Sequence, residues 1–556
     1  MKTTTRVTPT LIILPCAFLI ATLLLVGCNV HKYHQQQDEK AEQLQSHHSH
    51  AIIKSSCSTT FHPDLCHSAL SDHTFPQALT TPSEVVQALL NQTKKVVQSN
   101  HITIKKLSQL RNCTKRGRTA LDDCIELIQE TIEEIEDAVM ELKMYPSGDA
   151  LMQHADHLKT LMSAAMTNQD TCLDGFSHDK NDRKVRSGLI AGQVRVKRLC
   201  GNALAMITNL TASRTGHERK LSDQWPEWIS LGDRKLLQST NATFNAVVAA
   251  DGSGDFTTVS AAIAAAPSRS STRYVIRIKA GVYTENVNIP SSKPNIMLVG
   301  DSRLTTIITG SRNVVDGSTT FNSATVAAVG AGFLAKEITF QNTAGPSKHQ
   351  AVALRVGSDT SAFYRCDMLA YQDTLYVHSN RQFYISCYIA GSVDFIFGNA
   401  AAVFQNCDIH ARRPNPGQRN MVTAQGRSDP NQNTGIVIQK CRIGATSDLL
   451  PVQSSFPTYL GRPWREYSRT VVMQSAISNV INPAGWFPWS GTFALSTLYY
   501  AEYGNTGAGA DTSQRVTWEG YRGIISATEA AGFTPGSFIA GASWLGASGF
   551  PYSLGL

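Results

Sequence analysis

A repeat of about 20 residues in the second half of the chain constrains the fold more than any other feature. Cys366, Cys387 and Cys407 lie 21 and 20 residues apart in similar surroundings, and Cys441 belongs to a looser copy. Repetition at this period is typical of a solenoid, in which each repeat forms one coil that stacks on the next. Because the repeats contain short β-type runs, we predict a right-handed parallel β-helix.

The same repeat brings two acidic residues together. Asp373 and Asp394 are also 21 residues apart, and both lie among apolar and aromatic residues. Residues one period apart in such a stack lie above one another at the strand spacing of ~4.8 Å, so we expect the two carboxyl groups to be neighbours. At that distance they repel, and one should keep a proton near neutral pH while the other is ionised. The pair can therefore supply an acid together with a nucleophile or base.

Composition separates the start of the 556-residue chain from the rest. Residues 1–30 combine basic residues with a long apolar run, which predicts a secretory signal peptide or a signal anchor. Residues 31–50 are rich in His and Gln and predict a flexible stalk. With either type of signal the chain enters the secretory route, where disulfides can form.

Residues 51–212 predict an all-α domain. Between Leu121 and Val139, apolar residues recur every three or four positions, with acidic residues on the opposite face. Glycine and proline are sparse and the helical runs are long, so we predict a four-helix bundle. Its possible disulfides are Cys57 with Cys66 and Cys124 with Cys172. The candidate N-glycosylation sites of the chain are Asn91, Asn112, Asn209 and Asn241.

Residues 213–238 break the helical pattern and predict an exposed linker before the β-helix, which we place at 239–556. The linker ends with a basic pair, Arg234 and Lys235, that suits a processing protease. The net charge of +7 is compatible with an acidic polymer as partner. Basic runs interleaved with aromatic residues are absent from the sequence, which argues against nucleic acid.

Four motifs in the second half resemble the signatures of plant pectin methylesterases. They are GVYTE at 281–285, QDTL at 372–375, GSVDFIFG at 391–398 and LGRPW at 460–464. Residues 51–212 resemble the inhibitor-like pro-region of the longer members, and the pair at 234–235 resembles its processing site. The resemblance implies hydrolysis of methyl esters on polygalacturonan, with release of methanol and without a metal or other cofactor.

The resemblance also assigns roles to the two carboxyl groups and to nearby amides. Asp394 would be the nucleophile that attacks the ester carbonyl. Asp373 would protonate the departing methoxide and then take a proton from water. Gln372 and Gln350 would donate hydrogen bonds to the oxyanion of the tetrahedral intermediate.

Further residues match the orienting and substrate-binding positions of that family. Arg462 would keep Asp394 ionised and oriented, because a guanidinium lowers the pKa of a nearby carboxyl group. Trp464 would offer an apolar face to a sugar ring, and Thr320 would contact the substrate together with Gln350 and Arg462. The matching disulfide would join Cys387 to Cys407.

Two other functions are compatible with parts of the pattern. A polygalacturonase also uses paired carboxylates, but we would expect an Asp-Asp pair within the β-helix, and the only one lies at 122–123 in the helical part. A pectin-binding protein, whose helical half acts on another esterase, is the second alternative. For an esterase we expect a secreted monomer of the cell wall, kept silent by its helical half until the linker is cut. A separate inhibitor protein is a candidate partner.

Overall fold

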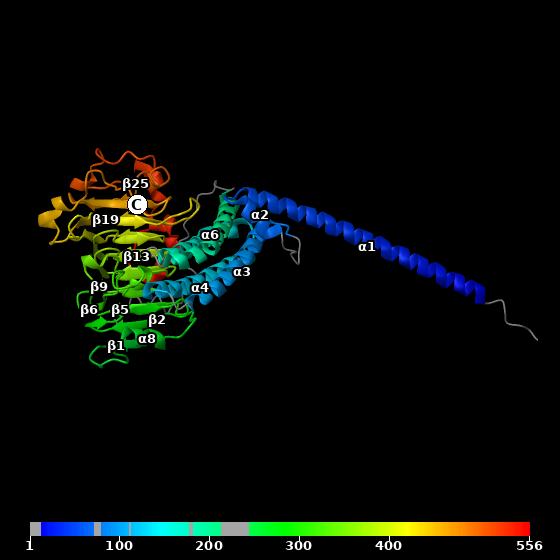
Figure 1. The fold of residues 1–556 in the computed structure, drawn as a ribbon, viewed down its shortest axis with the longest axis horizontal. Helices are drawn as coiled ribbons and strands as arrows, with labels where there is room; N and C mark the ends of the chain where they lie inside the picture. The colour runs from blue at the N-terminus through cyan, green and yellow to red at the C-terminus, as the bar shows by residue number, and fades with distance from the viewer. Residues whose placement is uncertain (1–12, 72–78, 110–112, 177–181, 213–243) are drawn as a thin grey trace, which may run out of the picture.

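The computed structural model describes residues 13–71, 79–109, 113–176, 182–212 and 244–556. Figure 1 shows a stack of strands with a group of helices against its side, and one long helix, α1, that projects away from both. The predicted linker at 213–238, with its processing site at Arg234 and Lys235, lies outside the described residues. The sequons at Asn112 and Asn241 lie outside them as well.

The first part of the chain is helical. Its described helices are α1 (Ile13–Ser58), α2 (Pro63–Ser71), α3 (Pro82–Ser108), α4 (Lys115–Met144), α5 (Gly148–Asp174) and α6 (Asp182–Ala212). Helices α3 and α5 each pack against both α4 and α6, which confirms the predicted four-helix bundle. Leu121, Ile128 and Ile135, from the predicted apolar stripe, are buried inside it. Asn91 and Asn209 lie exposed on α3 and α6, and their glycosylation stays a prediction.

Helix α1 corrects the prediction for residues 31–50. The sequence indicates a flexible stalk there, whereas the structure places this segment within the helix. The segment contains no Gly or Pro, and half of its residues are Gln, Glu, Lys or Ala, all of which have good helix propensity. The signal peptide or anchor predicted at 1–30 lies outside the described residues, except for the backbone of its helical part. In the part of the chain that the structure describes, no helix has the length and apolarity to cross a membrane.

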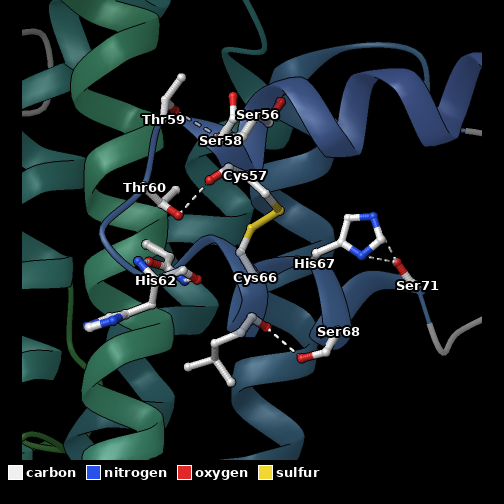
Figure 2. The surroundings of a disulfide bond; sticks show 12 residues. Ser56, Cys57, Ser58, Thr59, Thr60, His62, Cys66, His67, Ser68 and Ser71 are labelled. Carbon is white, nitrogen blue, oxygen red and sulfur yellow. Dashed lines mark hydrogen bonds between the residues drawn. A yellow bond between two sulfur atoms is a disulfide. The ribbon is translucent and has the colours of Figure 1, made fainter.

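Two disulfides connect the helices, as predicted. Cys57 at the end of α1 bonds to Cys66 in α2 and closes the short turn between these helices (Figure 2). Cys124 of α4 bonds to Cys172, two residues before the end of α5. The second bridge therefore fixes the end of α5, which reaches the candidate active site described below.

The second part is the predicted parallel β-helix, built from three parallel sheets. The first sheet contains, in spatial order, β1 (Ala246–Val248), β2 (Tyr274–Ile278), β5 (Ile296–Gly300), β8 (Leu334–Lys336), β11 (Ser361–Tyr364), β14 (Arg381–Ile385), β17 (Ala401–Gln405), β20 (Gly435–Gln439), β23 (Arg469–Met473), β25 (Tyr499–Tyr503) and β26 (Tyr521–Ile524). The second contains β4 (Val287–Ile289), β7 (Val326–Ala328), β10 (Leu354–Val356), β13 (Leu375–Val377), β16 (Ile396–Gly398), β19 (Asn420–Gln425) and β22 (Thr458–Pro463). The third contains β3 (Gly281–Thr284), β6 (Thr306–Gly310), β9 (Thr339–Asn342), β12 (Asp367–Leu369), β15 (Tyr388–Gly391), β18 (Asp408–Ala411), β21 (Arg442–Ala445) and β24 (Ala476–Ile477).

Short helices pack on this stack. Helix α8 (Val259–Ala265) lies next to β1. Helices α9 (Ala527–Ala531), α10 (Pro535–Phe538) and α11 (Leu545–Ser548) follow the last strand, and this C-terminal segment packs on the outer face of the first sheet, where Trp544 and Leu545 join one apolar cluster with Leu334. Inside the stack, the rings of Phe363, Tyr384 and Phe404 lie above one another, with ring centroids 4.8 and 4.6 Å apart. These rings come from successive strands of the first sheet. The core is therefore a column of side chains that follows the repeat.

The cysteine repeat marks the turn from the first sheet to the third. In successive coils the residue before each cysteine has a positive φ of 51–54°, and the cysteine side chain is buried. Cys387 and Cys407 are indeed neighbours, but their thiols are free, so the disulfide implied by the resemblance is wrong for this structure. They lie in equivalent turns between in-register strands, which keeps the Cβ atoms about one strand spacing of ~4.8 Å apart, more than a disulfide usually spans. The two thiols instead donate to the carbonyls of Phe363 and Tyr384.

Candidate active site

Asp373 and Asp394 lie in equivalent turns of neighbouring coils, directly before β13 and β16. Leu375 pairs with Ile396 in the parallel ladder, so the two aspartates are stacked as predicted. Both have a left-handed backbone, with φ of 62° and 52°. Residues other than glycine rarely adopt this backbone conformation, and it is found at sites where the surrounding structure enforces it. The turn therefore holds both carboxyl groups in one orientation, on the outside of the coil.

Arg462, at the end of β22, binds Asp394 with both arms of its guanidinium. Its Nε donates to Oδ1 at 2.7 Å and its Nη2 donates to Oδ2 at 2.6 Å. Paired charge-assisted bonds of this kind fix both the position and the ionised state of a carboxylate. Cζ of Arg462 also lies 4.3 Å from the centre of the Trp489 ring, which restricts the arginine from the other side.

Burial raises the pKa of both carboxyl groups. The rise is larger for Asp373, because the charge of Asp394 adds to the effect of burial. For Asp394, the charge and the hydrogen bonds of Arg462 oppose the rise. Asp373 therefore keeps its proton to a higher pH than Asp394 does. This difference in pKa is in the direction of the prediction that one group acts as an acid and the other as a carboxylate.

All seven predicted catalytic and substrate-binding residues line one cleft of about 380 Å³. They are Thr320, Gln350, Gln372, Asp373, Asp394, Arg462 and Trp464. The structure therefore places these residues in one cleft, whereas the chemical role of each residue stays a prediction.

Several aromatic residues of the cleft were not among the predictions. Tyr376 and Phe397 stack with their centroids 4.2 Å apart, and Trp464 meets both rings edge-on. These two residues are 21 positions apart, so the same repeat that identifies the aspartates could have identified them. Phe321 begins a short 3-10 helix and Trp489 lies in an irregular segment, and neither carries such a signal.

The floor of the cleft is a row of outward-facing residues on the second sheet. Arg355, Tyr376, Phe397, Ala424 and Arg462 are successive partners in the parallel ladder. The residues on either side of Arg355 and Tyr376 point into the core, because side chains alternate along a strand. The row therefore places an arginine on each side of an apolar, aromatic centre.

The helical domain covers this cleft. Thr171, Asp174 and Gly175, at the end of α5, are part of the cleft wall. The hydroxyl of Thr171 lies 3.0 Å from Nε2 of His378, and Asn399 donates to Thr167 at 2.8 Å. Tyr376, Phe397 and Ala424, among others, belong to one apolar cluster with the core of the bundle. The bundle therefore forms part of the wall of the cleft that contains the two aspartates.

Acidic side chains of α4 are buried where the bundle meets the β-helix. Asp123 is 4% exposed and accepts a hydrogen bond from the hydroxyl of Thr319. Burial raises the pKa of Asp123 to about 7 and that of Glu130 to about 8. At a pH below these values the folded chain therefore holds a proton on each of these two carboxyl groups.

We expect the stability of the helical domain in the full chain to fall as the pH rises from about 4 to 8. The unfolded chain releases these protons near pH 4, whereas the folded chain keeps those of Asp123 and Glu130 up to about 7 and 8. Between these values the folded state binds more protons, so each group lowers the free energy of unfolding by at most ~1.4 kcal/mol per pH unit. Thermal unfolding at several pH values measures the effect.

The variant Asp123→Asn should flatten this pH profile. Asp122→Asn is the matched control, because Asp122 is the exposed neighbour on the same helix and should leave the profile unchanged. If the midpoint temperature of thermal unfolding of the unmodified chain stays constant or rises between pH 5 and 8, the raised pKa values of Asp123 and Glu130 are contradicted.

Comparison with known proteins agrees with this architecture. Residues 245–542 match the family model described as Pectinesterase, and residues 51–206 match the model described as Plant invertase/pectin methylesterase inhibitor. The first match assigns the β-helix to a class of carboxylic ester hydrolases. The second assigns the bundle to a class of inhibitor domains.

The chain belongs to the pectinesterase family, in the form that carries an inhibitor-like domain. It is 59% identical to Pectinesterase/pectinesterase inhibitor U1 of Solanum lycopersicum over 98% of this chain and 96% of the relative. It is 66% identical to Pectinesterase 1 of Citrus sinensis over 91% of this chain and 89% of the relative. The solved pectin methylesterase from carrot is 78% identical, with a TM-score of 0.57, over 57% of this chain and all of the carrot chain. The solved carrot chain therefore corresponds to only part of this chain, about 57% of its length.

Proposed function

We propose that Asp394 and Asp373 carry out the hydrolysis of pectin methyl esters as nucleophile and acid–base, and that the helical domain inhibits the reaction. The observation that supports this best is the paired bond from Arg462 to Asp394, beside a stacked Asp373 whose pKa is raised by burial and by the charge of Asp394. The substrate would be methyl-esterified polygalacturonan in the cell wall. No step needs a metal or another cofactor.

In the first step an oxygen of Asp394 attacks the ester carbonyl and forms a tetrahedral intermediate. Its negative oxygen needs donors in the cleft, and the side-chain amides of Gln350 and Gln372 both line it. The intermediate collapses when the carbon–oxygen bond to the methoxy group breaks. Asp373 gives its proton to this oxygen, and methanol leaves.

In the second step water opens the anhydride that joins Asp394 to the sugar carboxyl group. Asp373, now ionised, takes a proton from the water molecule as its oxygen attacks the carbonyl. The bond to Asp394 breaks, which regenerates both side chains and leaves a carboxylic acid on the polymer; this acid then releases its proton to solvent. Arg462 holds Asp394 through both steps, since its two bonds match the carboxylate geometry.

An assay of two products distinguishes this reaction from the alternatives. The catalytic part, residues 239–556, is incubated with highly esterified pectin, and methanol and new reducing ends are measured together. We expect methanol without new reducing ends. New reducing ends would indicate a polygalacturonase, and the absence of both products, with pectin still bound, would indicate a binding protein.

The proposed inhibition rests on the contacts of α5. Its last residues occupy the cleft wall beside the aspartates, so the bundle and the polymer compete for one surface. Cleavage of the linker by a protease at Arg234 and Lys235 would then allow the bundle to leave. Secretion to the cell wall, a monomeric state and control by a separate inhibitor protein belong to the same proposal.

A further inference from the structure

The second sheet ends with β22, the strand that carries Arg462. No further strand of this sheet follows in the part of the chain that the structure describes, although the first sheet continues to β26. Residues 481–487 run beside β22 instead, as an irregular segment. They meet it through an isolated bridge between Gly461 and Trp486 and a hydrogen bond from the Phe487 nitrogen to the Gly461 carbonyl at 3.0 Å. Arg462 therefore lies at the last strand, with no regular neighbour on its outer side.

Trp489 occupies this outer side. It follows the irregular segment by two residues, and the centre of its ring lies 4.3 Å from Cζ of Arg462. A cation at this distance from an indole ring is within the range of a cation–π contact. Both residues line the cleft, and Trp489 is 37% exposed. A tryptophan so exposed contributes little to the core, so its contact with the arginine needs another explanation.

The guanidinium of Arg462 is thus held from two sides. On one side it donates its two bonds to Asp394, and on the other it meets the face of Trp489. An arginine side chain is long and loses about 2 kcal/mol of rotamer entropy when it is fixed in one conformation. A second contact reduces the number of conformations that compete with the paired bond. The ring therefore supplies, for the last strand, the restraint that a following coil supplies elsewhere in the stack.

We propose that Trp489 is a positioning residue for the proposed reaction, which holds Arg462 where both of its arms bind Asp394. This inference rests on the proposed function and adds a residue that acts through the arginine. Without the ring, Arg462 would leave the paired geometry for part of the time. Asp394 would then lose both its orientation and the positive charge that favours its ionised form.

The pH dependence of the reaction reports this role. The charged groups that face Asp394 are Arg462 and Asp373, while Tyr500 stays neutral because burial raises its pKa. Burial raises the pKa of Asp394, and the charge and hydrogen bonds of Arg462 oppose the rise. A looser Arg462 opposes it less, so the pKa of Asp394 increases. Because the nucleophile must be ionised, the acidic limb of the rate profile moves to higher pH.

A ring that only stacked on a sugar would have a different effect. Such a contact binds the substrate and the transition state equally, so its loss raises KM and leaves kcat and the pH profile unchanged. Loss of a positioning contact lowers kcat, because the nucleophile is correctly held for a smaller part of the time. The two roles of Trp489 are therefore separable by kinetics.

The test compares Trp489→Leu with Trp489→Phe in the β-helix part, isolated after the full chain has folded and its linker has been cut. Leucine keeps an apolar side chain without a ring, whereas phenylalanine keeps a ring face for the guanidinium. For Trp489→Leu we expect kcat on esterified pectin to fall about tenfold, the size of one cation–π contact expressed as a rate. The acidic limb of kcat should rise by about 0.5–1 pH unit, with KM changed by less than about twofold. Trp489→Phe should recover most of both losses.

Phe493→Leu is the matched control, since Phe493 is an exposed aromatic residue that follows in the same irregular region and lies outside the cleft lining. It should behave as the unmodified protein. Thermal unfolding accompanies each variant, and Trp489→Gln replaces Trp489→Leu if the leucine variant does not fold. An unchanged kcat and acidic limb, or a rise in KM alone, overturns the inference, as does a phenylalanine variant no better than leucine. If the unmodified β-helix part releases no methanol, the proposed function fails instead.

Discussion

Replacing Asp394 with alanine is expected to abolish methanol release while the β-helix stays folded. The variant removes the proposed nucleophile, and the loss of such a group lowers kcat by a factor on the order of 10⁴ or more. The turn at this position has φ of 52°, which alanine tolerates at a modest cost, and the rest of the stack does not depend on the carboxylate. Methanol release from esterified pectin by residues 239–556 is the measurement, with thermal unfolding to confirm the fold.

Asp394→Asn makes this test sharper, because it keeps the shape of the side chain and an oxygen that can accept a bond from Arg462. It removes only the charge and the nucleophile, and it should be as inactive as the alanine variant. Asp408→Asn is the matched control, since Asp408 is also paired with an arginine on the β-helix but lies away from the cleft residues. A folded Asp394 variant that releases methanol at the normal rate would exclude the assigned nucleophile.

Removing the helical domain is expected to produce the second largest effect. Residues 239–556 should release methanol about 10 to 1,000 times faster than the uncleaved full chain. This range follows if the open state of the full chain is populated at about 0.1–10%. The physical reason is the end of α5, where Thr171, Asp174 and Gly175 occupy the wall of the cleft.

The comparison requires a full chain that cannot be processed during the assay. Substituting Arg234 and Lys235 with Gln should provide such a chain, and the activity of this variant should stay low. Adding the protease to the unmodified chain should raise methanol release over time, whereas the substituted chain should not respond. Equal activity of 239–556 and the uncleaved chain would show that the bundle assists folding or transport only.

The geometry of the catalytic pair could be predicted because the repeat determines the register of the coils. A spacing of 21 residues between Asp373 and Asp394 translates directly into stacked positions, and the structure places them so. Tyr376 and Phe397 are separated by the same 21 residues, so their stacking could also be predicted from the repeat. Spacing does not determine how far apart two side-chain atoms lie: Cys387 and Cys407 are stacked neighbours, yet their thiols are free, and the disulfide implied by the resemblance is wrong.

The covering of the cleft by the bundle could not be predicted from periodicity. Asp174 and Arg465 are 291 residues apart in the sequence, and the contact depends on the shapes and charges of two separately folded surfaces. Trp489 likewise reaches the cleft from a segment without regular structure. The prediction of a flexible stalk at residues 31–50 is wrong for another reason. It relied on the polar composition of the segment, whereas residues of good helix propensity place it within helix α1.

The distribution of the cysteines has a consequence for the chemistry of activation. Among the described residues, both sulfur–sulfur bonds lie in the helical half, and one of them anchors the end of α5 that fills the cleft. The β-helix keeps its own thiols reduced and enclosed. A mild reductant should therefore loosen the inhibitor-like half and leave the esterase half intact, so that redox treatment separates the two roles of one polypeptide.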